Sequence, residues 1–405
     1  MPRLRIPSFL LLTAASLIFL QFRIHPDHKA ARIHRKVFTV DTHTDTPLNL
    51  MDSEISLGID NSFQNRGKID FIRMKKGGLD AVFFAVFVGQ GERSPEANEK
   101  ARFRALAIID TVTHAVARYP DLAAIVYTPQ EAYQLESEGR LAIFLGMENG
   151  YPIGQDLSMI STFYDLGIRY ITLCHSKNND ICDSSTDPDG PEFNGLSEFG
   201  QEVVKEMNRQ GMMIDVSHIS DSAFYDVLKI SSRPVIASHS CARGLCNHPR
   251  NLNDDMLRKL AEKGGVIQVC LISEYLIELP DDPRRDSAMA PIEEKYQHFD
   301  ELSADEKAWV RADWQKIDDM FPRQLASIQD LVDHIDHIVR VAGIDHVGIG
   351  SDFDGGAQVS DCMDVSQMAN ITAELVKRGY SKRDIRKIWG GNVMRVFEEA
   401  HGNEH

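Results

Sequence analysis

Histidine and acidic residues stand directly behind apolar segments at several points of this 405-residue chain. The first case is VFTVDTHTD, in which one residue separates His43 from Asp45. In an extended segment, residues two positions apart project to the same face, so this imidazole and this carboxylate could bind one divalent metal ion. The pair alone is weak evidence, because a capping histidine and a turn aspartate give the same pattern.

Later apolar runs end in the same way. A glutamate at such a position would be poorly solvated unless it is paired or bound to a metal. Each histidine or aspartate taken alone has an ordinary explanation as a core, loop or turn residue, and it is the repetition that favours one metal centre. The residues are Glu148 after AIFLGM, His175 after ITLC, His218 after IDVS, His239 after VIAS and Asp352 after VGIGS.

The types of ligand narrow the choice of metal. Imidazole nitrogen and carboxylate oxygen without thiolate suit zinc or a similar divalent ion in a hydrolytic site. So many ligands exceed one open catalytic zinc, and we expect two zinc ions per chain, about 3.5–4 Å apart, that share a carboxylate and a water. The six cysteines form no CxxC pair, which argues against a cysteine-type zinc site, and a Cys174–Cys182 bridge stays open.

The elements that must position these residues alternate between strand and helix. Near-continuous apolar runs interleaved with helix-like stretches are typical of a parallel sheet buried on both faces. Eight such units predict an α/β fold of the (β/α)8 TIM-barrel type, whose strand ends converge on one face. The alternative is a doubly wound open sheet, but the chain lacks the Gly-rich phosphate loop that such a sheet would want. The predicted strands lie near 37–42, 80–88, 141–147, 168–174, 212–217, 234–238, 265–271 and 346–351.

Residues 276–323 interrupt the alternation of strands and helices after the seventh predicted strand. They contain LPDDPRRDSAMAP and then a charged, helix-prone run with Trp309 and Trp314. We predict a lid-like segment inserted in the barrel at a βα loop, and the alternative is a solvated charged excursion.

The N-terminal residues 1–30 read as a targeting segment. Arg3 and Arg5 precede an apolar run over residues 6–22, and no A-x-A cleavage site follows at the proper distance. An uncleaved membrane anchor is the first interpretation, with a cleaved signal peptide and a structural first helix as alternatives. Residues 31–405 are then the catalytic barrel, on the extracytoplasmic side of a membrane or secreted.

The charge of the chain limits its partners. It has 60 acidic against 44 basic residues, a formal charge of −16, and no basic stripe beyond the N-terminal flank. Binding to nucleic acid needs clustered Lys and Arg, so nucleic acid is not an expected partner. The oligomeric state stays open, with a homodimer as one option.

The same residues resemble the membrane dipeptidase family, the renal-dipeptidase-like zinc peptidases. The similarity runs from VDTHTD at 40–45 to GGNVMRVF at 390–397, and it includes MENG, TLCH, IDVSH, ASHS, PRNL and GSDFDG in order. The chain departs from the family in the segment 276–323 and in its N-terminal apolar run without a C-terminal lipid-anchor tail.

The resemblance implies a role for each ligand. His43 and Asp45 would bind one zinc, His218 and His239 would bind the other, and Glu148 would bridge the two.

The resemblance also assigns the substrate side of the site. His175 would polarise the scissile carbonyl and hold the oxyanion, and Asp352 would shuttle the proton to the leaving amine. Arg250 would clamp the substrate's C-terminal carboxylate, for which its planar fork is suited. Tyr275 would line the cleft.

We therefore expect a zinc-dependent dipeptidase that cuts small dipeptides through a hydroxide bridging the metals. The resemblance extends this to dipeptides with a C-terminal D-residue. One alternative is a related binuclear-zinc barrel hydrolase for another small amide, such as an N-acyl amino acid, a cyclic amide or a β-lactam, which would not need Arg250. A non-catalytic binding protein would predict the loss of a ligand or of Asp352, and neither is lost.

Overall fold

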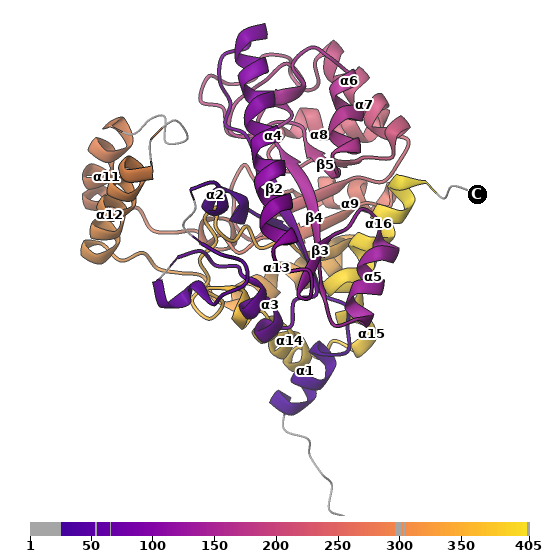
Figure 1. Ribbon diagram of the computed structural model, residues 1–405, viewed down its shortest axis with the longest axis vertical. Coiled ribbons are helices and arrows are strands. Elements are labelled where there is room, and N and C mark those ends of the chain that lie inside the picture. The colour runs from indigo at the N-terminus through magenta and orange to yellow at the C-terminus, as the bar shows by residue number, and fades with distance from the viewer. Residues whose placement is uncertain (1–25, 53–54, 65, 296–301, 303, 403–405) are drawn as a thin grey trace, which may run out of the picture.

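All eight predicted strands are present, and they run parallel in chain order around a barrel. The computed structural model describes residues 26–52, 55–64, 66–295, 302 and 304–402 (Figure 1). Each strand pairs with the next one in the order β1-β2-β4-β5-β6-β7-β8-β9. The strands are β1 (Val40–Thr44), β2 (Ala81–Phe87), β4 (Leu141–Glu148), β5 (Ile168–Thr172), β6 (Met213–Asp215), β7 (Ile236–Ser240), β8 (Val266–Val269) and β9 (Val347–Ile349).

The barrel closes between its last and first strands just beyond the end of β9. The amide of Asp352 donates to the carbonyl of His43 at 2.9 Å, and the amide of Asp45 donates to the carbonyl of Phe353 at 2.8 Å. The ligand pair of the first strand is therefore joined by main-chain hydrogen bonds to the segment that carries Asp352. The fold is the predicted (β/α)8 type.

One short strand was not predicted. β3 (Ala123–Ile125) pairs with the first half of β4, while β5 pairs with the second half. It lies off the path of the barrel and carries no predicted site residue.

Helices cover the outside of the barrel. Their ends follow local signals: a capping box between Thr128 and Glu131 begins α5, and Gly78 and Gly211 in left-handed conformation end α3 and α7. The helices are α2 (Thr46–Met51), α3 (Phe71–Gly77), α4 (Pro95–Ala117), α5 (Pro129–Ser137), α6 (Ser158–Asp165), α7 (Glu198–Gln210), α8 (Asp221–Ile230), α9 (Asp254–Glu262), α13 (Ile328–Ala342), α14 (Ala369–Lys377), α15 (Lys382–Arg386) and α16 (Asn392–His401).

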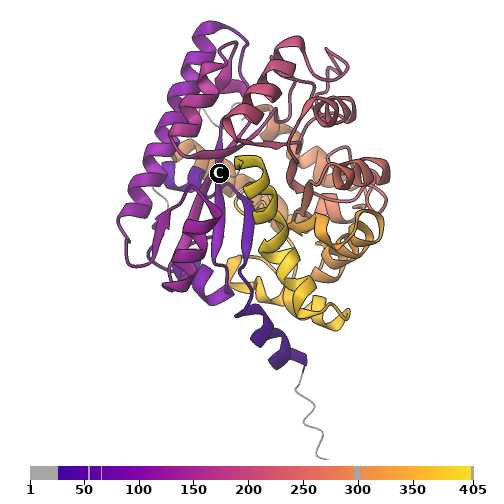
Figure 2. The same ribbon diagram turned by 90° about the vertical axis from the view of Figure 1, so that its right-hand side faces the viewer.

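Aromatic rings fill the barrel near the beginnings of its strands. Phe83 and Phe144 stack with their ring centroids 4.6 Å apart, and Phe397 of α16 packs edge-on against Phe144 at 5.5 Å. Helix α16 is the yellow helix near the centre of Figure 2. Above them Tyr170 enters the barrel over Gly146, where a Cβ atom would lie 2.1 Å from the tyrosine ring. The absence of a side chain at Gly146 therefore makes room for a buried tyrosine just below the predicted metal ligands.

The segment 276–323 is largely helical. After α10 (Ser273–Leu276) it forms α11 (Pro283–Lys295) and α12 (Ala304–Met320), which stand to one side of the barrel (Figure 1). Arg285 on α11 is buried against α12, with its Nη2 atom 2.6 Å from the carboxylate of Asp318. Arg311 of α12 lies 3.3 Å from Asp52, the residue that ends α2. The segment thus contacts the helix that begins at the predicted ligand Asp45.

A helix spans the boundary that the sequence predicts at residue 31. Helix α1 (Pro26–His34) packs against α14, and Ala30 and Ile33 are buried. The His34 ring lies 2.7 Å from the hydroxyl of Thr372 and 2.8 Å from the carbonyl of Gly77. The apolar run 6–22 lies outside the described residues, and among those residues no helix is long and apolar enough to cross a bilayer.

Candidate metal centre

Every predicted ligand lies at the same end of the barrel. His43 and His239 are inside β1 and β7, rather than after them as predicted, and Glu148 is the last residue of β4. Asp45 is the N-cap residue of α2, and its side chain makes no capping hydrogen bond. His218 follows β6.

Glu148 lies at the middle of this cluster. Its Oε2 atom is 3.3 Å from Nε2 of His43, and its Oε1 atom is 3.1 Å from Nε2 of His218 and 3.5 Å from Nε2 of His239. Nε2 of His175 is 3.6 Å from the same Oε1. A single carboxylate therefore faces four imidazoles, which suits the bridging role predicted for it.

Among the described residues, the potential ligand atoms form three overlapping groups, each within 4.8 Å. The first group shares Glu148 with the second and His43 with the third, so all three belong to one centre. They are His43 with Glu148 and His239, Glu148 with His175 and His218, and His43 with Asp45 and Asp352.

Unpartnered polar atoms show that the cluster fits a cation. Nε2 of His43 and Oδ1 of Asp45 are buried without a hydrogen-bond partner among the described residues. Nε2 of His218 and Nε2 of His239 face each other at 2.8 Å. Buried polar atoms in such an arrangement are costly unless something binds them, and a divalent ion accepts imidazole nitrogen and carboxylate oxygen alike.

The carboxylates of the centre repel one another. Burial and the charge of Glu148 raise the pKa of Asp45 well above its usual range. Burial raises the pKa of Asp352 to about 6, and Glu148 adds to this effect while His43 opposes it. A bound cation would relieve this repulsion, so the charge pattern also favours a metal.

The histidines divide into two kinds. Burial disfavours a charged His43, but the charges of Glu148, Asp45 and Asp352 outweigh it and raise the pKa of His43 to about 10. Burial lowers the pKa of His218 and of His239 well below the usual range. Metal ligands must be deprotonated, so a metal would compete with a proton mainly at His43.

The backbone is strained where two of these residues lie. His218 and Asp352 have φ angles of 71° and 63°, a left-handed region that costs residues other than glycine about 1–3 kcal/mol. Gly355 lies against the carboxylates, since a Cβ atom there would be 2.1 Å from both Asp352 Oδ1 and Asp45 Oδ2. The turn after β9 is thus shaped closely around two of the acidic side chains.

Arg250 and Tyr275 lie together beside the metal ligands. Arg250 is buried, its Nη2 donates to the carbonyl of His239 at 3.1 Å, and its Nε has no partner among the described residues. The guanidinium lies 5.5 Å from the ring centroid of Tyr275, and the His248 ring packs on the same tyrosine at 4.4 Å. A buried guanidinium with an unused donor, next to the centre, suits the recognition of an anionic group.

His175 is the most open member of the cluster. Its side chain is 26% exposed, against 8% or less for His43, Glu148, His218 and His239. Its Nδ1 atom lies 2.8 Å from the hydroxyl of Ser176, and its ring packs edge-on against Phe87. Nε2 points toward Glu148, so His175 borders the centre from the accessible side.

Sequence reasoning missed the polar residues beneath the ligands. Tyr170, Asp215 and Ser238 are fully buried and contact His43 and His239 directly or through one another. Asp215 and Ser238 stand within IDVSH and ASHS, so their proximity to the ligands was the available signal. The disulfide left open above is not formed, because all six cysteines are free and buried.

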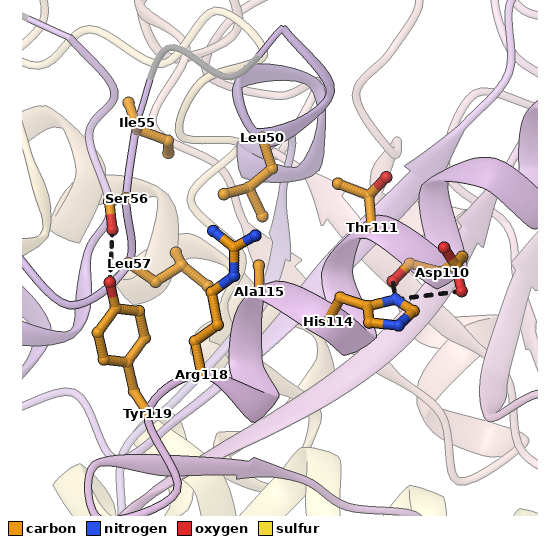
Figure 3. A pocket seen from close by; sticks show the side chains of 10 residues that line it. All are labelled: Leu50, Ile55, Ser56, Leu57, Asp110, Thr111, His114, Ala115, Arg118 and Tyr119. Carbon is orange, nitrogen blue, oxygen red and sulfur yellow. Dashed lines mark hydrogen bonds and ion pairs between the residues drawn. The ribbon is translucent and has the colours of Figure 1, made fainter.

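A separate cavity of about 460 Å³ lies between α2, the segment 55–57 and α4. The Arg118 side chain lies among Leu50, Ile55 and Leu57, while Tyr119 is hydrogen-bonded to Ser56 at 2.7 Å (Figure 3). None of the predicted site residues lines this cavity.

Comparisons with known proteins agree with this geometry. A sequence model described as membrane dipeptidase (peptidase family M19) matches residues 27–405. Dipeptidase tcpJ of Claviceps purpurea (strain 20.1) is 30% identical over 369 residues, which cover 89% of this chain and 76% of the relative. Dipeptidase verJ of Clonostachys rogersoniana is 32% identical over 381 residues, 92% of this chain and 86% of the relative. The crystal structure of the probable dipeptidase PvdM from Pseudomonas aeruginosa has 30% identity and a TM-score of 0.80, and the match covers 93% of this chain and 98% of that one.

Proposed function

The chain belongs to the membrane dipeptidase family and is a metal-dependent dipeptidase, and we propose that two zinc ions serve its active site. The observation that carries this proposal is the buried cluster around Glu148, in which imidazole nitrogens and carboxylate oxygens converge and several have no other partner. When bound, two zinc ions supply Lewis acidity that activates water and polarises the amide carbonyl. The proposed ligands are His43, Asp45, Glu148, His218 and His239.

Asp352 is the proposed proton carrier. It lies within the same group as His43 and Asp45, and burial brings its pKa to about 6, closer to neutrality than a usual carboxyl group. A group with such a pKa can accept a proton from the attacking water and return it to the leaving amine. We propose that His175, on the open side of the centre, donates a hydrogen bond to the carbonyl oxygen as charge develops there.

Arg250 is the proposed determinant of dipeptide specificity. Its unpartnered Nε and its charge suit the free carboxylate of a C-terminal residue. The neighbouring rings of Tyr275 and His248 restrict the space around the guanidinium. A site that binds the terminal carboxylate so close to the proposed metal ligands favours dipeptides over longer peptides. The resemblance to the family extends the proposal to dipeptides with a C-terminal D-residue.

The experiment measures metal content and substrate preference on the same preparation. We expect about two zinc ions per chain by elemental analysis, and hydrolysis of a dipeptide that falls sharply when its C-terminus is amidated. Equal turnover of the acid and the amide would favour the related barrel hydrolase, and a metal content of one or none would refute the binuclear centre.

Glu148→Gln tests the bridge specifically. It keeps the shape of the side chain but removes the charge that would hold two cations together. Metal occupancy and turnover should fall in parallel. A variant with unchanged turnover would show that Glu148 is structural.

We further propose that residues 6–22 attach the enzyme to a membrane or direct its export, so that the barrel acts outside the cytoplasm. The support is the apolar sequence of this run and its position directly before α1. Fractionation of cells that express the full chain, beside a chain that starts at Pro26, tests it. Recovery of both in the cytosolic fraction would contradict the proposal.

A further inference from the structure

A hydrogen-bonded layer lies directly beneath the ligands, and Asp215 is its centre. This fully buried carboxylate accepts hydrogen bonds from the hydroxyl of Thr172 at 2.5 Å, from the hydroxyl and amide of Ser238 at 2.6 and 2.8 Å, and from the amide of Ser217 at 3.0 Å. Both of its oxygens therefore act as acceptors, and the hydroxyl proton of Ser238 is committed to Asp215.

This commitment determines which nitrogen of His239 carries the proton. Nδ1 of His239 lies 2.8 Å from the hydroxyl oxygen of Ser238, which can only accept because its own proton is used. Nδ1 must then hold the hydrogen, and Nε2 is left with a lone pair. Nε2 is the atom that faces Glu148, so Asp215 orients a ligand that it does not touch.

His43 is oriented by a different residue in the same way. The hydroxyl of Tyr170 donates to the carbonyl of Thr42 at 3.1 Å and so accepts from Nδ1 of His43 at 2.8 Å. Nε2 of His43 faces Glu148, and because Nδ1 keeps its proton for Tyr170, Nε2 is the nitrogen that gives up its proton when a metal binds. His218 differs, because its Nδ1 atom is buried without a hydrogen-bond partner among the described residues.

We propose that Asp215 with Ser238, and Tyr170, are positioning residues that orient the rings of His239 and His43 and hold a proton on Nδ1 of each, which leaves Nε2 of each ring for the metal. The inference rests on the proposed metal centre. Each set of positioning residues affects one metal position. Ser238 and Asp215 affect the position to which His239 would contribute, and Tyr170 affects the position to which His43 would contribute. His218 has no such partner at Nδ1 among the described residues, so a bound metal would fix its ring instead.

The chain offers a matched pair of variants for the test. Ser238 and Ser240 are both fully buried residues of β7, but the hydroxyl of Ser240 has no hydrogen-bond partner among the described residues. Ser238→Ala should weaken zinc binding at one of the two positions about 10–100-fold, the usual effect of removing such a partner. Ser240→Ala should bind zinc as the unmodified protein does.

Zinc affinity is measured by competition with a chromophoric chelator, starting from the metal-free full-length protein. A second readout needs no metal: the Nδ1 proton of His239, followed by NMR of protein labelled with ¹⁵N in its histidines. We expect a slowly exchanging Nδ1 proton in the unmodified protein and in Ser240→Ala, and its loss in Ser238→Ala. Tyr170→Phe should instead remove the corresponding signal of His43 and weaken the other zinc position.

Asp215→Asn should reverse the direction of these hydrogen bonds, while the side chain keeps nearly the same shape. An amide at this place can donate to the Ser238 hydroxyl, which would then donate to Nδ1 of His239 and move the imidazole proton to Nε2. We expect reduced zinc affinity with a fold kept intact by circular dichroism, so this variant also serves if Ser238→Ala folds poorly.

The inference is overturned if Ser238→Ala and Ser240→Ala bind zinc equally, or if the Nδ1 proton persists in Ser238→Ala and Asp215→Asn. A failure of the metal centre itself looks different. The unmodified protein would then bind no zinc, while its NMR spectrum would still show the Nδ1 protons of His239 and His43.

Discussion

Replacing Arg250 by methionine should narrow the preference of the enzyme for a free C-terminal carboxylate. Arg250 is buried beside the metal centre, and one of its nitrogens, Nε, has no partner within the described structure. Methionine keeps much of the apolar stem and removes the charge and the donors. Arg250→Lys is the companion change, because it keeps the charge and loses the planar fork.

The size of the effect follows from the hydrogen bonds that would be lost. A hydrogen bond between charged groups contributes about 1.5–3 kcal/mol, and a carboxylate held by two N–H groups would lose about 3 kcal/mol or more. At about 1.4 kcal/mol per factor of ten, kcat/KM on a dipeptide should fall by roughly two orders of magnitude. A dipeptide amide carries no charge at that end, so its kcat/KM should fall by about tenfold or less.

The ratio of kcat/KM on the acid to kcat/KM on the amide separates a loss of carboxylate recognition from a general disturbance of the active site. Arg250 also donates to the carbonyl of His239, so its loss disturbs the ligand strand for both substrates alike. That common cost cancels when kcat/KM on the acid is divided by kcat/KM on the amide. If Arg250→Met lowers both by the same factor while zinc content and circular dichroism are unchanged, the carboxylate is held by another group and the clamp assignment fails.

Two further predictions concern the turn after β9 and the N-terminus. Gly355→Ala should lower metal occupancy and activity together, because the added methyl group would lie 2.1 Å from the carboxylates of Asp45 and Asp352; normal occupancy by elemental analysis would contradict this. A chain lacking residues 1–25 should keep its activity and melting temperature, whereas one that begins after His34 should melt several degrees lower, since it lacks α1 and the buried contacts of that helix. Equal melting temperatures of the two shortened chains would show that α1 does not stabilise the domain.

The sequence predicted the barrel because each strand is a short apolar run bounded by turns. The face of the sheet toward the barrel interior and the face covered by helices are both apolar, so the strands appear in the sequence as near-continuous apolar runs. That the candidate ligands would lie close together could be predicted for a related reason, since the carboxyl ends of parallel strands meet at one face. The position of His239 inside β7 was not predicted, because the polar stretch ASHS resembles the end of a strand.

The layer beneath the ligands could not be derived from the sequence. His43 and Tyr170 are 127 positions apart, and their contact depends on Gly146 leaving space within the barrel. Serines and aspartates in a strand end are ordinarily explained as turn residues, and only the register of β6 against β7 brings Asp215 to Ser238. The sequence also did not indicate that a helix would span the boundary predicted at residue 31, because α1 follows the apolar run without a clear change in composition.

The left-handed backbone at His218 and Asp352 implies a trade-off between the stability of the fold and the activity of the enzyme. The backbone at these two residues has a conformation that glycine adopts without strain, so the fold gives up stability to hold His218 and Asp352 there. At Asp352, asparagine would remove a buried carboxylate whose charge is disfavoured by burial and by Glu148. An Asp352→Asn protein should therefore melt at a higher temperature in its metal-free form and turn over almost no substrate. Selection for a high melting temperature alone would therefore enrich inactive variants of this kind. A search for stabilised variants of this enzyme has to measure hydrolysis as well as melting temperature.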